Sequence, residues 1–100
     1  MISRRIDREM IEGLAEDRCN RVIVEALRGK EDGMLTLKKV VSITNRYSYD
    51  SIRKHALYLS EAEIIAYNVQ REDGTQRVYM RLENNDATKH FLRTAENYTE

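Results

Sequence analysis

The chain has 100 residues, of which 41% are hydrophobic and 34% are charged, and its 17 basic residues balance its 17 acidic residues. This length suits a single domain with one core, and the composition is that of a folded globular chain rather than a disordered one. Zero net charge excludes the simplest argument for nucleic-acid binding, which is a globally basic chain. Evidence for or against such binding must therefore come from how the charges are distributed along the sequence.

The sequence carries no pattern typical of membrane insertion, secretion or catalysis. No apolar run approaches the roughly 20 residues that span a bilayer, and the N-terminal residues 1–5 are followed by charged residues and not by an apolar segment, so we expect a cytoplasmic protein. Cys19 is the only cysteine, which predicts a small buried side chain rather than a disulfide or a metal ligand. His55 and His90 lack partners with catalytic spacing, and there is no glycine-rich phosphate loop. We therefore expect no enzyme activity, no cofactor and no metal.

Two amphipathic helices are predicted at the beginning of the chain. Apolar residues recur at helical spacing over residues 2–14, and Ser3 is suited to cap this first helix. The pattern restarts near Asp17 and stops at Gly29. A glycine at that point is typical of a helix C-terminus, so a second helix is predicted between these two residues.

A helix-turn-helix pattern follows a short extended segment at residues 34–36. A third helix is predicted over residues 37–45, and its apolar side consists of Leu37, Val40, Val41 and Ile43. After a tight turn, Ser48 is a natural N-cap for a fourth helix. The buried face of this helix carries Ile52, Ala56 and Leu59. Two helices joined in this way are typical of a helix-turn-helix.

The opposite face of the fourth helix is polar and mildly cationic. It presents Tyr49, Asp50, Arg53 and Lys54. Between residues 34 and 59 the basic residues are Lys38, Lys39, Arg46, Arg53 and Lys54, whereas Asp50 is the only acidic one. Clustering of one sign of charge in one segment favours a surface that faces phosphate groups.

The most specific local signal is a β-hairpin after the fourth helix. Asp73-Gly74 favours a two-residue type I′ turn, because both central positions of that turn need a positive φ angle. Counting outward from this turn places every apolar pair on one face: Val69 with Val78, Tyr67 with Met80, and Ile65 with Leu82. The other face pairs Gln70 with Arg77, Asn68 with Tyr79, and Ala66 with Arg81. The register therefore predicts one face that seals a core and one polar face.

A last amphipathic helix is predicted after Asn85 or Asp86, one of which caps it. Its apolar stripe consists of Ala87, Phe91, Ala95 and Tyr98. The first and last helices leave apolar surface outside the central elements, and we expect part of it to meet a second copy of the chain. The sequence thus predicts a single mostly helical α+β domain with an N-terminal helix (1–17), a core (18–84) and a C-terminal helix (85–100).

Residues 17–82 resemble the ArsR-type winged-helix regulators, and MarR-like proteins share most of the pattern. Asp17–Leu27 is similar to the helix opening D-P-T-R-x-x-I-L-x-x-L, without its Pro and Arg. Asp50–Leu59 is similar to the recognition helix S-x-x-S-x-H-L-x-x-L, including the histidine. Ala62–Ile65 stands where the family has A-G-L-V, and Gln76–Leu82 matches the G-R-x-x-Y-x-L end of the wing.

Two departures from the family limit what the resemblance implies. Glu63 replaces a glycine, so the corner after the recognition helix must form without a residue that accepts a positive φ angle easily. The paired-cysteine motif of the metal sensors is missing, which gives no basis for a metal-responsive mechanism.

The resemblance implies a winged helix-turn-helix protein that binds double-stranded DNA. It would form a homodimer through its terminal helices. It would regulate transcription, as a repressor or an activator, in association with the nucleoid. The helix over residues 48–59 would enter the major groove, and the wing over residues 70–77 would contact the backbone or the minor groove. Arg53 is the expected base reader, because a guanidinium group can bond a guanine edge twice. The expected DNA-binding residues are Lys38, Lys39, Arg46, Ser48, Tyr49, Asp50, Ser51, Arg53, Lys54, Arg71 and Arg77.

Two other functions are compatible with the same sequence. An architectural or segregation protein would coat DNA with little sequence preference. A winged helix used for protein contacts would bind no duplex, and the neutral net charge keeps this alternative open.

Overall fold

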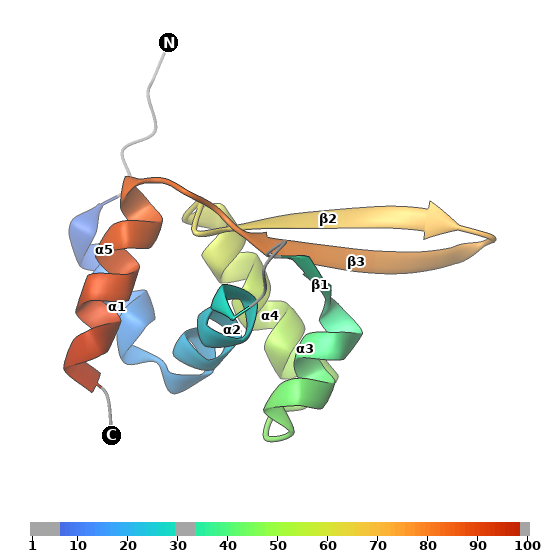
Figure 1. Ribbon diagram of the computed structural model, residues 1–100, viewed down its shortest axis with the longest axis horizontal. Coiled ribbons are helices and arrows are strands. Elements are labelled where there is room, and N and C mark those ends of the chain that lie inside the picture. The colour runs from blue at the N-terminus through green and yellow to red at the C-terminus, as the bar shows by residue number, and fades with distance from the viewer. Residues whose placement is uncertain (1–6, 30–33, 99–100) are drawn as a thin grey trace, which may run out of the picture.

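The structure is a computed structural model that describes residues 7–29 and 34–98. Within these residues the chain forms five α-helices, one short 3-10 helix and three β-strands. In chain order they are α1 (Arg8–Glu16), α2 (Arg18–Arg28), β1 (Met34–Thr36), α3 (Leu37–Thr44), α4 (Tyr49–Glu61), β2 (Ile65–Glu72), β3 (Thr75–Leu82), α5 (Asp86–Ala95) and η1 (Glu96–Tyr98). The predicted mostly helical α+β fold is confirmed, and the arrangement is compatible with a winged helix that carries a β-hairpin (Figure 1).

Side-chain caps set the start of each helix. The Ser48 hydroxyl accepts a hydrogen bond from the Ser51 amide at 3.1 Å, as the sequence predicted for α4. For α5 the cap is Asn85 and not Asp86. The cap of α1 is Asp7, whose carboxylate accepts from the Glu9 amide. The predicted cap at residue 3 lies outside the described residues.

The core lies where α2, α3 and α4 meet the base of the sheet and α5. The sequence placed Ile52, Ala56 and Leu59 on the inner face of α4, and all three are buried. The prediction was wrong for Ile43, which is 46% exposed because it lies on the outer side of α3. Cys19 is buried, as expected of a small apolar side chain.

The hairpin forms in the predicted register. All eight pairs from Ile65–Leu82 to Glu72–Thr75 match the pairing counted outward from the turn. Asp73 and Gly74 take φ angles of 52° and 77°, as a type I′ turn requires. The short strand β1 pairs with β3, so the sheet has the order β1-β3-β2. The sequence predicted the extended segment of β1 but not its partner.

Only the base of the hairpin seals the core, which corrects the expectation that one whole face would do so. Met80 is 0% exposed, whereas Val69, on the same face, is 53% exposed. Beyond Met80 the strands leave the body and extend as a free-standing wing (Figure 1). The hairpin is longer than the core that it covers, so its outer half is available for contacts with another molecule.

The corner between α4 and β2 uses a left-handed residue that is not glycine. Glu63 has a φ angle of 64°. The Ile64 amide donates to the Leu59 carbonyl at 3.0 Å and the Glu63 amide donates to the Ser60 carbonyl at 2.9 Å, which closes the helix end. The Asn85 side chain donates to the Glu63 carbonyl at 2.8 Å and ties this corner to α5.

The terminal helices α1 and α5 pack against each other on the side of the molecule away from the wing (Figure 1). The predicted apolar stripe of α5 is directed partly inward, and Phe91 is 0% exposed. The imidazole of His90 lies 2.9 Å from the Glu12 carboxylate and links the two helices. The other end of the stripe, Tyr98, is 38% exposed, and its ring lies 4.9 Å from the Arg21 guanidinium carbon.

Candidate nucleic-acid interface

The outer face of α4 is open to solvent. Tyr49, Asp50, Arg53 and Lys54 are all exposed, as the sequence predicted for this face. Ser48 is also exposed, but its hydroxyl accepts the capping hydrogen bond. Four predicted DNA-binding side chains therefore share one uncovered helix surface.

Ser51 lies differently from its neighbours on α4. It is half-buried, and its hydroxyl group hydrogen-bonds to the Cys19 thiol of α2. Burial raises the pKa of that thiol to about 11, the hydrogen bond from Ser51 opposes the shift, and the Asp17 carboxylate adds to it. This serine therefore joins two helices and does not extend the open face.

Asp17 fixes α4 against the beginning of α2. One carboxylate oxygen accepts from the Cys19 amide at 2.8 Å and caps α2. The other lies 3.3 Å from Nε2 of His55 on α4. The Nδ1 atom of the same ring lies 2.8 Å from the Ser51 carbonyl oxygen. The histidine thus orients α4, which is a structural role.

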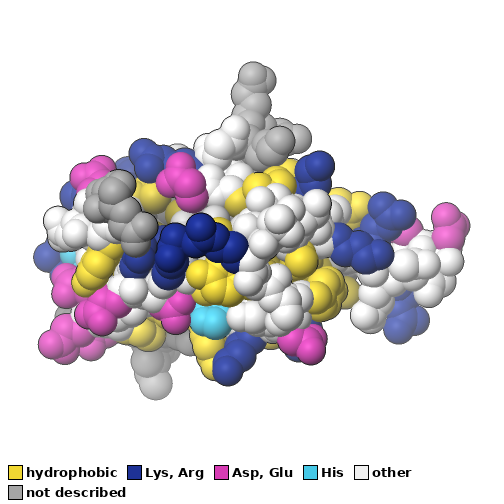
Figure 2. All heavy atoms as spheres, turned by 90° about the horizontal axis from the view of Figure 1, so that it is seen from below, with side chains coloured by type: hydrophobic (Ala, Val, Ile, Leu, Met, Phe, Trp, Pro, Cys, Tyr) yellow, Lys and Arg dark blue, Asp and Glu magenta, His cyan; other side chains and the backbone are white. Residues whose placement is uncertain are grey.

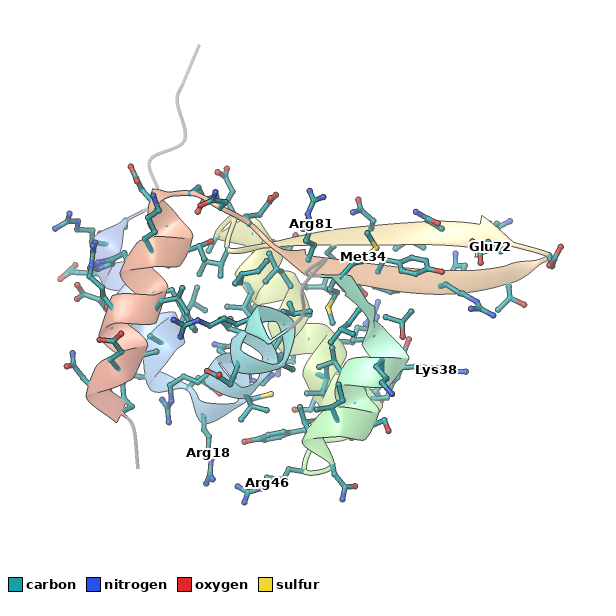
Figure 3. The ribbon with its side chains drawn as sticks, in the orientation of Figure 1. Arg18, Met34, Lys38, Arg46, Glu72 and Arg81 are labelled. Atoms are coloured by element: carbon teal, nitrogen blue, oxygen red, sulfur yellow. The ribbon has the colours of Figure 1, made fainter. Side chains whose placement is uncertain are left out.

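The wing has two chemically different sides. Side chains alternate along a strand, so Tyr67, Val69 and Arg71 share the side on which Met80 is buried against the helices. Arg77 lies on the opposite side, where its Nε atom is 3.7 Å from the Glu72 carboxylate. Arg81 shares that opposite side and points away from the helices (Figure 3). The two predicted wing cations, Arg71 and Arg77, therefore belong to different sides of the hairpin.

The base of the wing meets α4 through Arg53. Its guanidinium lies beside the Tyr67 hydroxyl, and Tyr49 is close to the same group. Burial raises the pKa of Tyr67; the positive charge and hydrogen bond of Arg53 oppose that shift, whereas Tyr49 adds to it. The expected base reader on α4 is thus held next to a wing residue that the sequence analysis had counted only as a core side chain.

The remaining predicted cations lie on α3 and in the turn before α4. Lys38 and Lys39 are exposed on α3, and Lys38 extends toward the space below the wing (Figure 3). Arg46 is exposed in the turn before α4 and points to the lower end of the molecule. Arg18 of α2 extends from the same end (Figure 3). Arg18 is not among the predicted DNA-binding residues, because it lies far from the basic segment along the chain.

Seen from below, Lys and Arg side chains cross the middle of the body and recur along the wing (Figure 2). Acidic side chains gather at the opposite end of the body and at the tip of the wing. Hydrophobic side chains reach the surface between the body and the wing (Figure 2). The charge is therefore distributed by region, although its sum is zero.

Among residues 7–29 and 34–98, no three side chains of the metal-ligating types gather in one place. None of the helices in this part of the chain has the length and apolar character needed to cross a membrane. A cavity of about 300 Å³ lies between α2, α5 and η1. Its apolar floor includes Val24 and Phe91, and it contains no nucleophile beside a general base.

These features are compatible with a winged helix-turn-helix protein. No protein-family model and no curated protein sequence matches the chain. A solved structure with a similar fold is that of a possible transcriptional regulator from Methanosarcina mazei Go1. The TM-score is 0.63 and the sequence identity is 11%, over 90% of this chain and 77% of that one. At this level of identity the similarity shows a common fold.

Proposed function

We propose that this protein is a winged-helix transcription regulator of the ArsR/MarR-like kind that binds double-stranded DNA sequence-specifically as a homodimer. In this proposal α4 enters the major groove, where Arg53 reads a guanine edge and Tyr49 and Asp50 lie near neighbouring bases. Lys54, together with Lys38, Lys39 and Arg46, binds phosphates. The wing tip over residues 70–77 contacts the backbone or the minor groove, and no catalytic step is involved.

The observation that carries the proposal is the pairing of an uncovered helix with a free-standing wing. The outer face of α4 exposes Arg53 and Lys54, and the outer half of the hairpin covers no core. The outer face of α4 lies beside a hairpin that extends beyond the core, and together they leave a surface that a duplex can fill. The fold shared with a possible transcriptional regulator supports the same proposal.

Electrophoretic mobility shifts and fluorescence anisotropy at several salt concentrations test the proposal. The probes are a randomised duplex pool and the fragments that the protein selects from it. We expect selected fragments to bind about 10³-fold or more tightly than random DNA. The logarithm of the affinity should fall with the logarithm of salt concentration, by about 0.9 for each phosphate neutralised.

Two substitutions on α4 assign the binding surface, and one on α5 is their control. Arg53→Ala should remove about 1 to 3 kcal/mol of base discrimination, and Lys54→Glu should weaken binding to all sequences. Lys89→Glu makes the same charge change at an exposed position on α5 and should leave binding to a single half-site unchanged. If the α4 variants bind like the wild type, then α4 is not the reading helix.

A second candidate function is a module that contacts proteins and not DNA. The wing tip favours it, because the Arg77–Glu72 ion pair and the neighbouring Asp73 leave little net positive charge there. This function predicts no shift of any duplex at low salt, in contrast to both DNA-binding functions. An architectural protein would instead bind the selected and random duplexes equally well.

A further inference from the structure

The structure has an exposed apolar surface at the junction between α4 and the wing. We define the notch as the surface formed by Tyr49 and Arg53 of α4 with Tyr67, Val69 and Arg71 of β2. Tyr49 is 44% exposed and Val69 is 53% exposed, and both are among the most exposed large apolar side chains of the described residues. Exposed side chains of this kind favour a partner with apolar groups of its own.

The strand register places the three β2 residues on the side of the wing that faces the helices. Tyr67 pairs with the buried Met80, and Val69 and Arg71 follow at alternate positions on the same side. α4 packs against β2, and both Arg53 and Tyr49 of α4 act electrostatically on the Tyr67 hydroxyl. The notch therefore joins the reading helix and the wing in one surface.

We propose that the notch recognises the methyl groups of thymine next to a guanine that Arg53 reads. This inference rests on the proposed function and adds to it the class of base that the protein prefers. In the major groove, thymine differs from cytosine by presenting an oxygen acceptor and a C5 methyl group, and apolar side chains contact that methyl group. Tyr49 and Val69 provide such contacts, and Arg53 provides the two donors that a guanine edge accepts.

The charges around the notch favour DNA over a protein or a second copy of the chain. Arg53 and Arg71 belong to the notch, and Lys38 of α3 extends below the wing in the view of Figure 3. Lys54 lies beside Arg53 on α4, where the nearest acidic residue is Asp50. A second copy would bring the same guanidinium groups into contact, whereas a duplex offers phosphates for the cations and methyl groups for the apolar side chains.

Replacing thymine by uracil tests the inference, because uracil lacks only the C5 methyl group and keeps the same base pairing. Duplexes that the wild-type protein selects from a randomised pool are amplified with either dTTP or dUTP, and both pools are titrated by fluorescence anisotropy. We expect the thymine pool to bind more tightly, by about fourfold for each methyl group that is contacted. Selected sequences should also be enriched in thymine beside guanine.

Val69→Thr assigns the effect to the notch. Threonine keeps the shape and strand preference of valine but replaces a methyl group by a hydroxyl. This variant should reduce the affinity ratio between the thymine and uracil pools toward one. Asn68→Thr is the matched control, because residue 68 is the adjacent exposed position on the opposite side of the same strand, and it should keep the wild-type ratio.

Each outcome decides between the alternatives. Equal wild-type affinity for the two pools overturns the inference and leaves the proposed function standing. If Val69→Thr loses the same affinity for both pools, the wing contacts the backbone and not the methyl groups, and this result also overturns the inference. No binding to either pool overturns the proposed function itself. If sedimentation then shows that Val69→Thr dissociates a wild-type oligomer, the notch is an interface between protein chains.

Discussion

At the scale of single residues, the most informative position is Glu63. The sequence predicted a difficult corner there, because glutamate replaces the glycine of the family that the chain resembles, and the structure gives Glu63 a φ angle of 64°. A left-handed conformation costs a residue with a side chain about 1 to 2 kcal/mol. The corner persists because backbone hydrogen bonds close the end of α4 and the Asn85 side chain holds the Glu63 carbonyl.

Glu63→Gly should therefore stabilise the protein. We expect a gain of about 1 kcal/mol, somewhat less than the strain that is relieved, because glycine also gains freedom in the unfolded chain. In a domain of this size the gain corresponds to an increase in Tm of about 4 to 8 °C. Circular dichroism melting measures it. Glu25→Gly, at an exposed position inside α2, is the control and should lower the stability by about 1 kcal/mol.

The thiol of Cys19 gives a second prediction at this scale. Burial raises its pKa from 9.0 to about 11, so the folded protein keeps the proton that the unfolded chain releases. The free energy of unfolding should then fall as the pH rises from 9.0 toward 11. Urea unfolding across this pH range measures the slope. Cys19→Ala removes the group and should flatten the part of the slope that the thiol causes; an identical slope in both proteins would contradict the assignment.

At the scale of elements, local signals in the sequence located α4 and the hairpin well. Ser48 and Asp73-Gly74 act through their immediate neighbours, so the cap and the register could be read without knowledge of the fold. What could not be read depends on distant contacts. The exposure of Val69 depends on where the helices end beneath the sheet, and the contact between Arg53 and Tyr67 joins two elements whose angle no local pattern specifies.

Because the outer half of the wing covers no core, we expect that the wing can be shortened without loss of stability. Deleting Arg71 and Glu72 together with Thr75 and Gln76 removes two residues from each strand, so the Asp73-Gly74 turn joins Gln70 to Arg77 with the pairing pattern kept. All four deleted residues are exposed. We expect the unfolding free energy to change by less than about 0.5 kcal/mol, as for surface changes in general.

The same shortened wing should bind DNA more weakly under the proposed function, because it lacks the cation of Arg71. Anisotropy titrations should show a shallower salt dependence, by about 0.9 in slope if Arg71 binds one phosphate. Unchanged affinity and slope, together with unchanged stability, would mean that the wing tip does not contact the duplex.

At the scale of the whole molecule, the terminal helices have a larger structural role than the sequence suggested. Part of their apolar surface was expected to meet a second copy; in the structure α1 and α5 pack on each other, and Phe91 is fully buried in the common core. Removal of such a phenylalanine side chain typically costs about 3 to 5 kcal/mol. A chain truncated before α5 would therefore lose its fold, so a dimer interface has to be tested by changes at the surface.

Met10 is the position at which the proposed homodimer can be tested without disturbing the core. It is 44% exposed on α1, in the helix layer away from the wing (Figure 1). In a symmetric dimer the same patch is used by both copies, so Met10→Glu introduces two carboxylates into an apolar contact. We expect the variant to sediment as a monomer where the wild type is a dimer, and to lose affinity for palindromic sites while still binding single half-sites. Met10→Leu, which keeps the apolar character, should remain dimeric. A dimer that tolerates the glutamate places the twofold contact on another surface, because two like charges buried at its centre would dissociate it.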